Sequence, residues 1–446
     1  MALNPTFNIQ WHITNRCGLR CRHCYLRGRN KALPTELGLD QCRQVVDSFV
    51  RAAATLRAQP TVDLTGGDPL LCEHFWELFA YLREKKIRVS ILGNPCMLNA
   101  STIERLKAGG LHDYQLSIDG LEKNHDWLRK KGSFAANMAA FQLLKEHQVS
   151  SGMMFTLTRR NRNDLLPVMR LAAELGHRAF AFDTLSPVGP KDECEKIMLS
   201  PLELRDTYKQ YLAESQRLGL QGYKTVFTRK NHLYALIMEE KGLLHKVQSD
   251  QTTFFMGCPI GKGLIINSEG SVLPCPRIPI PIGNVPESEI LDILLHSELL
   301  TKFRDRKNHR VCGTCSLFQY CRGCRASAWG VSGDIFGPDP YCWKSHQTEN
   351  TAPAPEPAEP DGSKRMEEIM GIYYGWDYQP KLKYDPRFQE ILGRALRDKT
   401  FLKRLTADPA GTCRDYGYPI TERILFELGR MEFDSFFDIL KESKEF

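Results

Sequence analysis

Long hydrophobic runs are missing from this sequence. No stretch approaches the ~20 apolar residues that cross a bilayer, and the first residues lack the charged and then apolar pattern of a signal peptide. These absences argue against a membrane protein and predict a cytoplasmic one. The length of 446 residues and the 42% hydrophobic content allow a large core and predict two or three domains.

A basic stripe is missing as well. The net charge of +7 is only mildly basic, and no run of Lys and Arg alternates with aromatic residues in the way that follows a phosphate backbone. Nucleic acid is therefore not expected as a partner. An acidic peptide or a ferredoxin is compatible with this charge.

Cysteine, in contrast, is abundant, with 15 residues. The cytosol keeps thiols reduced, so clustered cysteines in such a chain are better explained as metal ligands than as disulfides. Their spacing must decide which metal they bind.

The first 200 residues alternate short β-type runs with longer helical patterns, which is typical of βα units and a parallel sheet. Six strands are predicted, at residues 7–14, 61–65, 88–92, 113–118, 152–157 and 180–185. The predicted fold is α/β, a partial (β/α)6 barrel of the TIM type over residues 1–200.

Four further segments follow the barrel. Residues 201–250 are predicted to form a helical connector, and residues 251–348 are rich in Gly, Pro and Cys with little periodicity. A Pro-rich, acidic linker is predicted at 349–365. Residues 366–446 are predicted to form a small helical domain, with amphipathic patterns at 385–405 and 422–442.

The first cysteine motif, CxxxCxxC, comprises Cys17, Cys21 and Cys24 and directly follows the first predicted strand. Catalytic loops of a barrel lie at this end of its strands. Three thiolates can bind three irons of a [4Fe-4S] cluster and leave the fourth iron open. The alternative is a structural zinc site, which would need His12 or His23 as its fourth ligand.

This motif resembles the radical SAM superfamily, whose members bind S-adenosylmethionine (SAM) at the open iron and split it to a 5′-deoxyadenosyl radical. The GGDP run after the second strand is similar to the family's GGE motif, with Asp in place of Glu. The resemblance implies SAM contacts at Tyr25, Gly66, Gly67, Asp68, Pro69, Asn94, Ser117, Asp119, Thr158 and Asn161. Strand-end Asp, Asn and Ser residues also satisfy local backbone donors, so the single polar residues have this second explanation.

A second set of seven cysteines is similar to the SPASM domain, beginning with a predicted hairpin that turns at 268–270. The resemblance implies two further [4Fe-4S] clusters, three in all. The ligands of the inner cluster would be Cys258, Cys275 and Cys324, and those of the outer cluster Cys312, Cys315, Cys321 and Cys342. The inner set lacks a fourth cysteine, for which Cys194, Asp250 or a substrate thiolate are candidates.

The combined resemblance is to radical SAM maturases of ribosomally made peptides. It implies a thioether, another crosslink or an oxidised side chain on a leader-bearing peptide, with a flavodoxin or ferredoxin as electron donor. The first strand begins near residue 7, so leader recognition is expected from a separate protein or from the tail. Two alternatives stay open, namely side-chain modification of a tetrapyrrole, suggested by CRGCRA at 321–326, and protein oxidation as in anaerobic sulfatase maturation. A multi-cluster electron carrier would leave the barrel and GGDP unexplained.

Overall fold

The structure is a computed structural model that describes residues 6–26, 35–228, 230, 232–242, 258–261, 263–345, 391, 394 and 398–418. The chain divides into two compact units, one of residues 4–374 and one that holds residues 375–446. Within the described ranges, no helix has both the length and the apolar character needed to cross a membrane.

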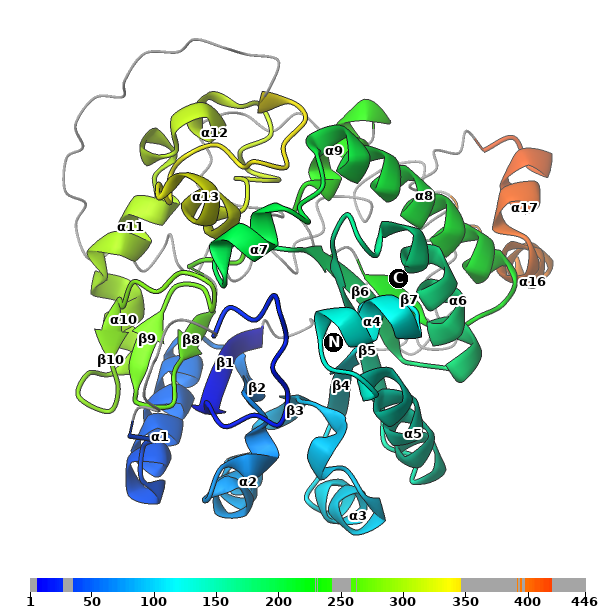
Figure 1. The fold of residues 1–446 in the computed structure, drawn as a ribbon. Helices are drawn as coiled ribbons and strands as arrows, with labels where there is room; N and C mark the ends of the chain where they lie inside the picture. Colours follow the sequence, from blue (N-terminus) through cyan, green and yellow to red (C-terminus); the bar gives the residue numbers. More distant parts are fainter. Residues whose placement is uncertain are drawn as a thin grey trace. The chain divides into compact units, whose positions relative to one another are not determined.

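The six predicted strands are present and run parallel as consecutive neighbours in one curved sheet (Figure 1). They are β1 (Thr6–Thr14), β2 (Gln59–Gly66), β3 (Arg88–Leu92), β4 (Asp113–Ser117), β5 (Ser151–Leu157) and β6 (Ala179–Thr184). This arrangement confirms the predicted partial barrel.

Helices alternate with these strands and cover the outer face of the sheet (Figure 1). They are α1 (Leu39–Thr55), α2 (Phe75–Glu84), α3 (Ala100–Ala108), α4 (Glu122–Leu128), α5 (Ser133–Glu146), α6 (Leu165–Leu175) and α7 (Lys191–Glu195). Short 3-10 turns η1 (Pro69–Leu71), η2 (Pro95–Met97) and η3 (Arg162–Asp164) follow strands β2, β3 and β5. In α1 the buried Val45, Phe49 and Ala52 recur at helical spacing, which is why this helix packs one face on the sheet.

The segment predicted as a helical connector also contributes a strand, which the sequence analysis did not expect. After α8 (Pro201–Leu220), β7 (Val226–Thr228) pairs in parallel with β6, and α9 (Tyr234–Glu240) follows. A strand of three residues is too short to show an alternating pattern. The barrel therefore continues past the predicted boundary at residue 200.

The two faces of the barrel sheet differ in character. Residues such as Phe7, Val62 and Phe182 point to the helices and are fully buried; Phe7 lies 5.2 Å from Phe49 of α1. Their neighbours in sequence point to the barrel interior and stay partly exposed, as in the alternating burial of β3, β4 and β6. The partly exposed interior positions are Asn8, Gln10, Asp63, Ser90, Leu92, Gln115, Ser117, Thr156, Ala179, Ala181 and Asp183.

The cysteine-rich region is attached to the edge of the same sheet. Strand β8 (Leu264–Ile266) pairs in parallel with β1, and β9 (Ser271–Leu273) and β10 (Gly283–Asn284) extend the sheet antiparallel. The predicted hairpin is thus β8–β9, and its turn residue Gly270 has φ +93° with its Cα close to the carbonyl of Val285. The remaining elements are short, namely α10 (Ile290–His296), α11 (Glu298–Arg304), η4 (Arg306–Asn308), α12 (Arg310–Thr314) and α13 (Arg325–Ser332).

In the second unit the structure describes α16 (Lys399–Ala407) and α17 (Pro409–Asp415). Helix α16 overlaps the predicted pattern at 385–405, and Phe401 packs edge-on against Tyr416 with ring centroids 4.9 Å apart. The linker at 349–365 and the pattern at 422–442 lie outside the described residues. The domain boundaries proposed from the sequence stay predictions. Strand β7 is an element that they did not include.

Candidate active site

The first cysteine motif forms a loop at the carboxyl end of β1, and donors from the loop itself and from two other segments point at its sulfurs. Cys17 Sγ accepts from the Leu19 amide at 3.4 Å and from Asn94 Nδ2, after β3, at 3.7 Å. Cys21 Sγ accepts from the Arg129 guanidinium at 3.8 Å. Such donors stabilise thiolates, so this surrounding suits a metal-bound form of the cysteines.

The three thiols lie close enough to affect one another. Burial raises the pKa of Cys21 to about 11, and the neighbouring Cys24 and Cys17 raise it further, while Arg129 opposes them. Burial likewise raises the pKa of Cys17, with an added contribution from Cys24. The free thiols of Cys17 and Cys21 are therefore protonated at neutral pH, and binding of a cluster has to displace their protons.

Gly66 and Gly67 hold this loop against the end of β2. The Gly67 amide donates to Thr14 O and the Asp68 amide to Arg16 O, both at 2.8 Å. Gly66 has φ +117°, and a Cβ at either glycine would lie 2.1 Å from a carbonyl oxygen of the loop. The two glycines thus allow the cysteine loop to pack closely against the end of β2. This role was not predicted from the sequence.

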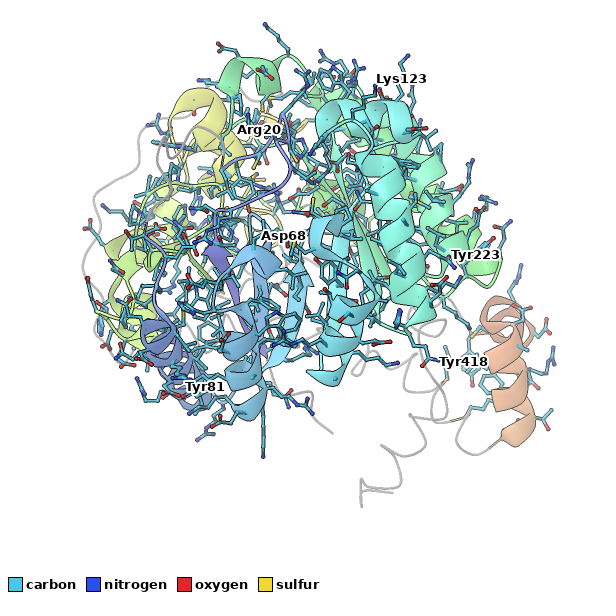
Figure 2. All side chains as sticks on the ribbon, turned by 60° about the horizontal axis from the view of Figure 1, so that its bottom comes forward. Arg20, Asp68, Tyr81, Lys123, Tyr223 and Tyr418 are labelled. Atoms are coloured by element: carbon cyan, nitrogen blue, oxygen red, sulfur yellow. The ribbon has the colours of Figure 1, made fainter. Side chains whose placement is uncertain are left out.

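Two buried polar atoms beside the loop have no hydrogen-bond partner in the described part of the chain, Asp68 Oδ2 and His23 Nδ1. Figure 2 shows Asp68 well inside the unit, far from the helix surface that carries Tyr81. Burial raises the pKa of Asp68 to about 6 and lowers that of His23 to about 4. Unsatisfied polar groups at this depth fit a polar ligand that binds beside the cysteines.

Asp119, predicted as a SAM contact, is completely buried and forms an ion pair with Arg129 at 2.6 Å. Its other oxygen accepts from the Thr156 amide at 2.7 Å. Asn161 accepts from Thr158 at 2.7 and 2.9 Å and donates to the Asp119 carbonyl at 2.9 Å. These three predicted residues are satisfied within the protein, so the geometry favours a role in positioning Arg129 and the strand ends.

The remaining predicted SAM contacts lie at the same end of the barrel. The Tyr25 hydroxyl is 3.5 Å from His12 Nε2, and Ser117 is partly exposed on the inner face of β4. Asn94 is nearly buried and also accepts from the Cys96 amide at 3.0 Å. Pro69 is buried at the start of η1.

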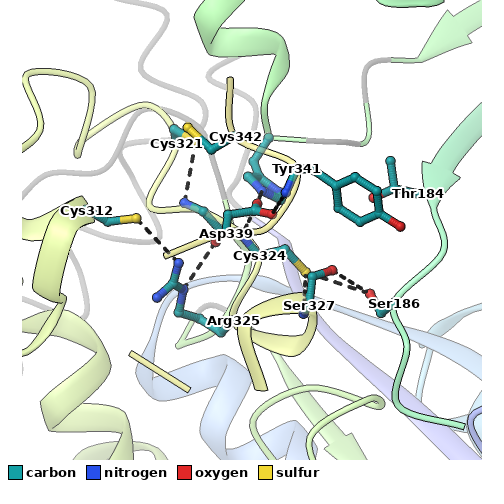
Figure 3. Close-up of polar contacts among 12 residues, drawn as sticks. Thr184, Ser186, Cys312, Cys321, Cys324, Arg325, Ser327, Asp339, Tyr341 and Cys342 are labelled. Atoms are coloured by element: carbon teal, nitrogen blue, oxygen red, sulfur yellow. Dashed lines mark hydrogen bonds and ion pairs between the residues drawn. The ribbon is translucent and has the colours of Figure 1, made fainter. Parts of the chain in front are cut away.

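The structure brings the predicted inner set of cysteines together. The pKa of Cys275 is raised to about 12, mainly by burial and in part by the nearby Cys258 and Cys324, against the opposing effect of Arg277. Cys324 Sγ accepts from the Ser327 amide at 3.4 Å and lies 3.9 Å from the Ser186 hydroxyl (Figure 3). The candidate fourth ligand Cys194 is buried in α7, and Asp250 lies outside the described residues.

The predicted outer set is also brought together. Burial raises the pKa of Cys321 well above its usual value, and Cys342 and Cys312 add to this rise. Cys315 in turn raises the pKa of Cys312. Backbone amides donate to Cys315 Sγ and Cys321 Sγ, each at 3.4 Å. Arg325 donates to Cys312 Sγ at 3.5 Å (Figure 3).

In the described residues, no three His, Cys, Asp or Glu side chains converge closely enough to hold a single metal ion. The cysteines of a [4Fe-4S] cluster each bind a different iron, so they are spread more widely than the ligands of one ion.

One segment, residues 185–189, contacts both cysteine regions. Gly189 packs against the Cys24 backbone, where a Cβ would lie 2.7 Å from the carbonyl oxygen. The Leu185 carbonyl accepts from the Tyr341 hydroxyl at 2.5 Å, and Ser186 lies 3.1 Å from Ser327. The end of β6 therefore lies between the first motif and the inner set.

Sequence reasoning missed the charged residues around the sulfurs. Arg129 is distant from any cysteine motif in sequence, so no local pattern marks it, whereas Arg277 lies two positions after Cys275. Arg325 directly follows Cys324, which was a usable signal. Cys96 also lies beside the first loop, where its sulfur is 3.0 Å from the position of a Cβ on Gly18.

Comparison with known proteins gives two domain matches. The profile of the radical SAM superfamily matches residues 11–172, and that of the SPASM iron-sulfur cluster-binding domain matches residues 258–325. These matches cover the first cysteine loop and most of the second cysteine set.

Curated relatives carry two different names. An AdoMet-dependent heme synthase of Methanosarcina barkeri is 27% identical over 339 residues, 75% of this chain and 95% of its own. The mycofactocin maturase MftC of Mycolicibacterium smegmatis is 26% identical over 369 residues, 80% of this chain and 88% of its own. Among solved structures, Streptococcus suis SuiB bound to S-adenosylmethionine has a TM-score of 0.62 at 19% identity, covering 76% of this chain and 78% of its own, which shows a shared fold.

Proposed function

Since this chain is a radical SAM enzyme with a SPASM domain, we propose that it modifies a ribosomally made peptide with a 5′-deoxyadenosyl radical derived from SAM. The product is a thioether or another crosslink, or an oxidised side chain. A flavodoxin or ferredoxin supplies the electron. The cofactors that its two domains imply are [4Fe-4S] clusters and SAM.

In this proposal Cys17, Cys21 and Cys24 hold the first cluster. A three-cysteine cluster supplies an open iron for SAM and the low-potential electron that splits the sulfonium. The donors from Leu19, Asn94 and Arg129 stabilise the thiolates.

SAM fits beside this loop because polar atoms there lack partners. The neutral His23 offers a ring nitrogen, and Asp68 offers a carboxylate oxygen that suits the methionine ammonium. Asp119 holds Arg129 in place through the 2.6 Å ion pair. The role of Asp119, Thr158 and Asn161 is thereby to position the site. Direct contact with SAM is made by residues that line the barrel end.

The polar interior of the barrel is the observation that favours a peptide as the substrate. Barrels of this type usually fill their interior with bulky branched side chains. Here Gln10, Asp63 and Ser90 lie side by side on β1, β2 and β3, and Thr156 pairs with Asp183, all partly exposed. Amides, hydroxyls and carboxylates suit the hydrogen-bonding groups of a peptide better than the flat apolar face of a tetrapyrrole.

The test is anaerobic reconstitution of the full chain with iron and sulfide, followed by incubation with SAM, reductant and short peptides encoded beside its gene. We expect about twelve irons per chain, the sum of three four-iron clusters, and 5′-deoxyadenosine together with a peptide that has lost hydrogen atoms by mass spectrometry. The variant Cys17→Ala/Cys21→Ala/Cys24→Ala should form no 5′-deoxyadenosine. SAM cleavage in the triple variant at the wild-type rate would refute the assignment.

A tetrapyrrole substrate is the second candidate, favoured by the similarity to heme synthases and by CRGCRA at 321–326. Titration with an iron porphyrin distinguishes the two. A saturable shift of the porphyrin absorption band, lost in Asp63→Leu/Gln10→Leu, would favour the tetrapyrrole and overturn the peptide. Protein oxidation of the sulfatase-maturase kind is the third candidate; it predicts a fourth cysteine in the inner set, and the stretch before Cys258 supplies none.

A further inference from the structure

Arg325 is one of the largest fully buried side chains of the protein, with 1% of its surface exposed. It follows Cys324 at the start of α13. Its guanidinium donates to the carbonyls of Gly337 at 2.8 Å, Ile335 at 3.3 Å and Gly323 at 3.4 Å. It also donates to Cys312 Sγ at 3.5 Å (Figure 3). All three oxygen acceptors are neutral.

A buried cation is costly unless a negative charge lies next to it. No described carboxylate forms an ion pair with Arg325. The nearby Asp339 instead accepts from His232 at 2.8 Å and from the amides of Cys324 and Tyr341 at 2.7 and 3.0 Å. The negative partner that the described structure offers Arg325 is therefore the Cys312 thiolate and the cluster that it would hold.

The inner set has a different electrostatic environment. Its neighbouring cation Arg277 is neutralised by Asp183 at 2.8 Å and also donates to Ser186 at 3.3 Å. A second buried cation, Arg322, lies next to Cys258 of the inner set and Cys321 of the outer set, so it does not distinguish the two sets. The donors to Cys324 Sγ are a neutral amide and a neutral hydroxyl. Asp339 acts on cysteines of both sets, so it does not distinguish them. The difference between the sets is the uncompensated positive charge of Arg325.

We propose that Arg325 gives the outer auxiliary cluster a higher reduction potential than the inner one. A positive charge and an N–H···S bond stabilise the reduced, more negative form of a cluster. An electron shared by the two clusters then resides mainly on the outer one. This inference rests on the cluster assignment proposed above and adds the order of the two potentials.

The experiment uses the full chain with Cys17→Ala/Cys21→Ala/Cys24→Ala, so that only the auxiliary clusters remain. Iron is counted first, with about eight irons expected for two four-iron clusters. A reductive titration followed by electron paramagnetic resonance then compares Arg325→Met and Arg325→Lys in this background. The matched control is Arg310→Met, which removes an exposed cation that pairs with Asp334 at 2.9 Å in the same region.

We expect Arg325→Met to lower only the higher of the two transitions. At the potential where half of that cluster was reduced, the ratio of reduced to oxidised cluster should fall about tenfold, equivalent to 59 mV for one electron. Arg325→Lys, which keeps the charge, should shift less, and Arg310→Met should leave both transitions in place.

Three results would overturn the inference. One is full iron content with no shift in Arg325→Met, or a shift of the lower transition instead. Another is an equal shift in Arg310→Met. The third is loss of about four irons in both Arg325 variants, because Arg325 would then only support the fold of the site. A parent protein with far fewer than eight irons would refute the cluster assignment itself, which separates that failure from this one.

Discussion

The barrel and the cysteine-rich region of residues 258–345 are held together in different ways. The barrel has strands of up to 9 residues, helices of up to 20 and a continuous core of apolar side chains. The cysteine-rich region has strands of two or three residues and helices of five to eight. It buries Arg322 and Arg325 next to cysteines. The apolar core continues into the cysteine-rich region, but because its elements are short and it buries cations, we expect this region to depend also on the negative charge and bonds of metal clusters.

Removal of iron should give the largest effect. In protein stripped by a chelator under reducing conditions, we expect residues 258–345 to lose most of their protection from amide hydrogen exchange, because the buried cations lose their counter-charge. Strands β2 to β5 should stay protected. Equal protection of both regions in the iron-free protein would remove the contrast between them.

A substitution in the apolar core should have the opposite effect and destabilise the barrel. Phe49→Ala removes a fully buried ring that packs on Phe7 and should lower the free energy of unfolding of the barrel by about 3–5 kcal/mol. Denaturant titration of the iron-free protein measures this loss. Leu220→Ala, at an almost fully exposed position of α8, is the control and should change little. Similar losses in both variants would show that the barrel does not depend on its core in this way.

Gly66→Ala should act on both the fold and the metal. Alanine at φ +117° and 2.1 Å from Thr14 O forces the cysteine loop away from β2, at a cost of about 3 kcal/mol. We expect loss of about four irons and of SAM cleavage, with the auxiliary irons retained. The control is Gly132→Ala, where φ is +80° and a Cβ meets nothing within 4 Å; it should cost about 1 kcal/mol. Full iron and activity in Gly66→Ala would contradict the docking role.

The smallest expected effect is at a link between the two regions. Arg51 of α1 pairs with Glu289, just before α10, at 2.7 Å, but both side chains are about half exposed. Arg51→Ala should therefore change the free energy of unfolding by less than about 1 kcal/mol. A larger loss, measured by thermal unfolding of the reconstituted protein, would mean that this contact couples the regions more strongly than an exposed pair can. Lys302→Ala, which breaks an exposed pair within α11, is the matched control.

The six barrel strands could be predicted because each is long enough to alternate between the helix-facing and the interior side. Strand β7, at Val226–Thr228, could not, since three residues carry no period and it is defined by pairing with β6. The same limit explains why the predicted helical connector did not include this strand.

The cysteines of the candidate sites could be found from spacing, because ligands of one cluster recur at short intervals in sequence. The contacts that the charged residues around these cysteines make could not be found in this way. Arg129 reaches Cys21 over 108 positions, and Arg277 pairs with Asp183 over 94. Such pairs arise only when strands and loops distant in sequence meet, and a single sequence does not show which ones do.

Residues 185–189 have a consequence for evolution of this architecture. Their backbone packs on the Cys24 loop at one end and on α13, through Pro187 and Gly330, at the other. An insertion or deletion of one residue here would change the separation of the radical-forming site from the inner cysteines. Under the proposed function, the length of this segment therefore limits the size of the substrate group that can lie between the two sites.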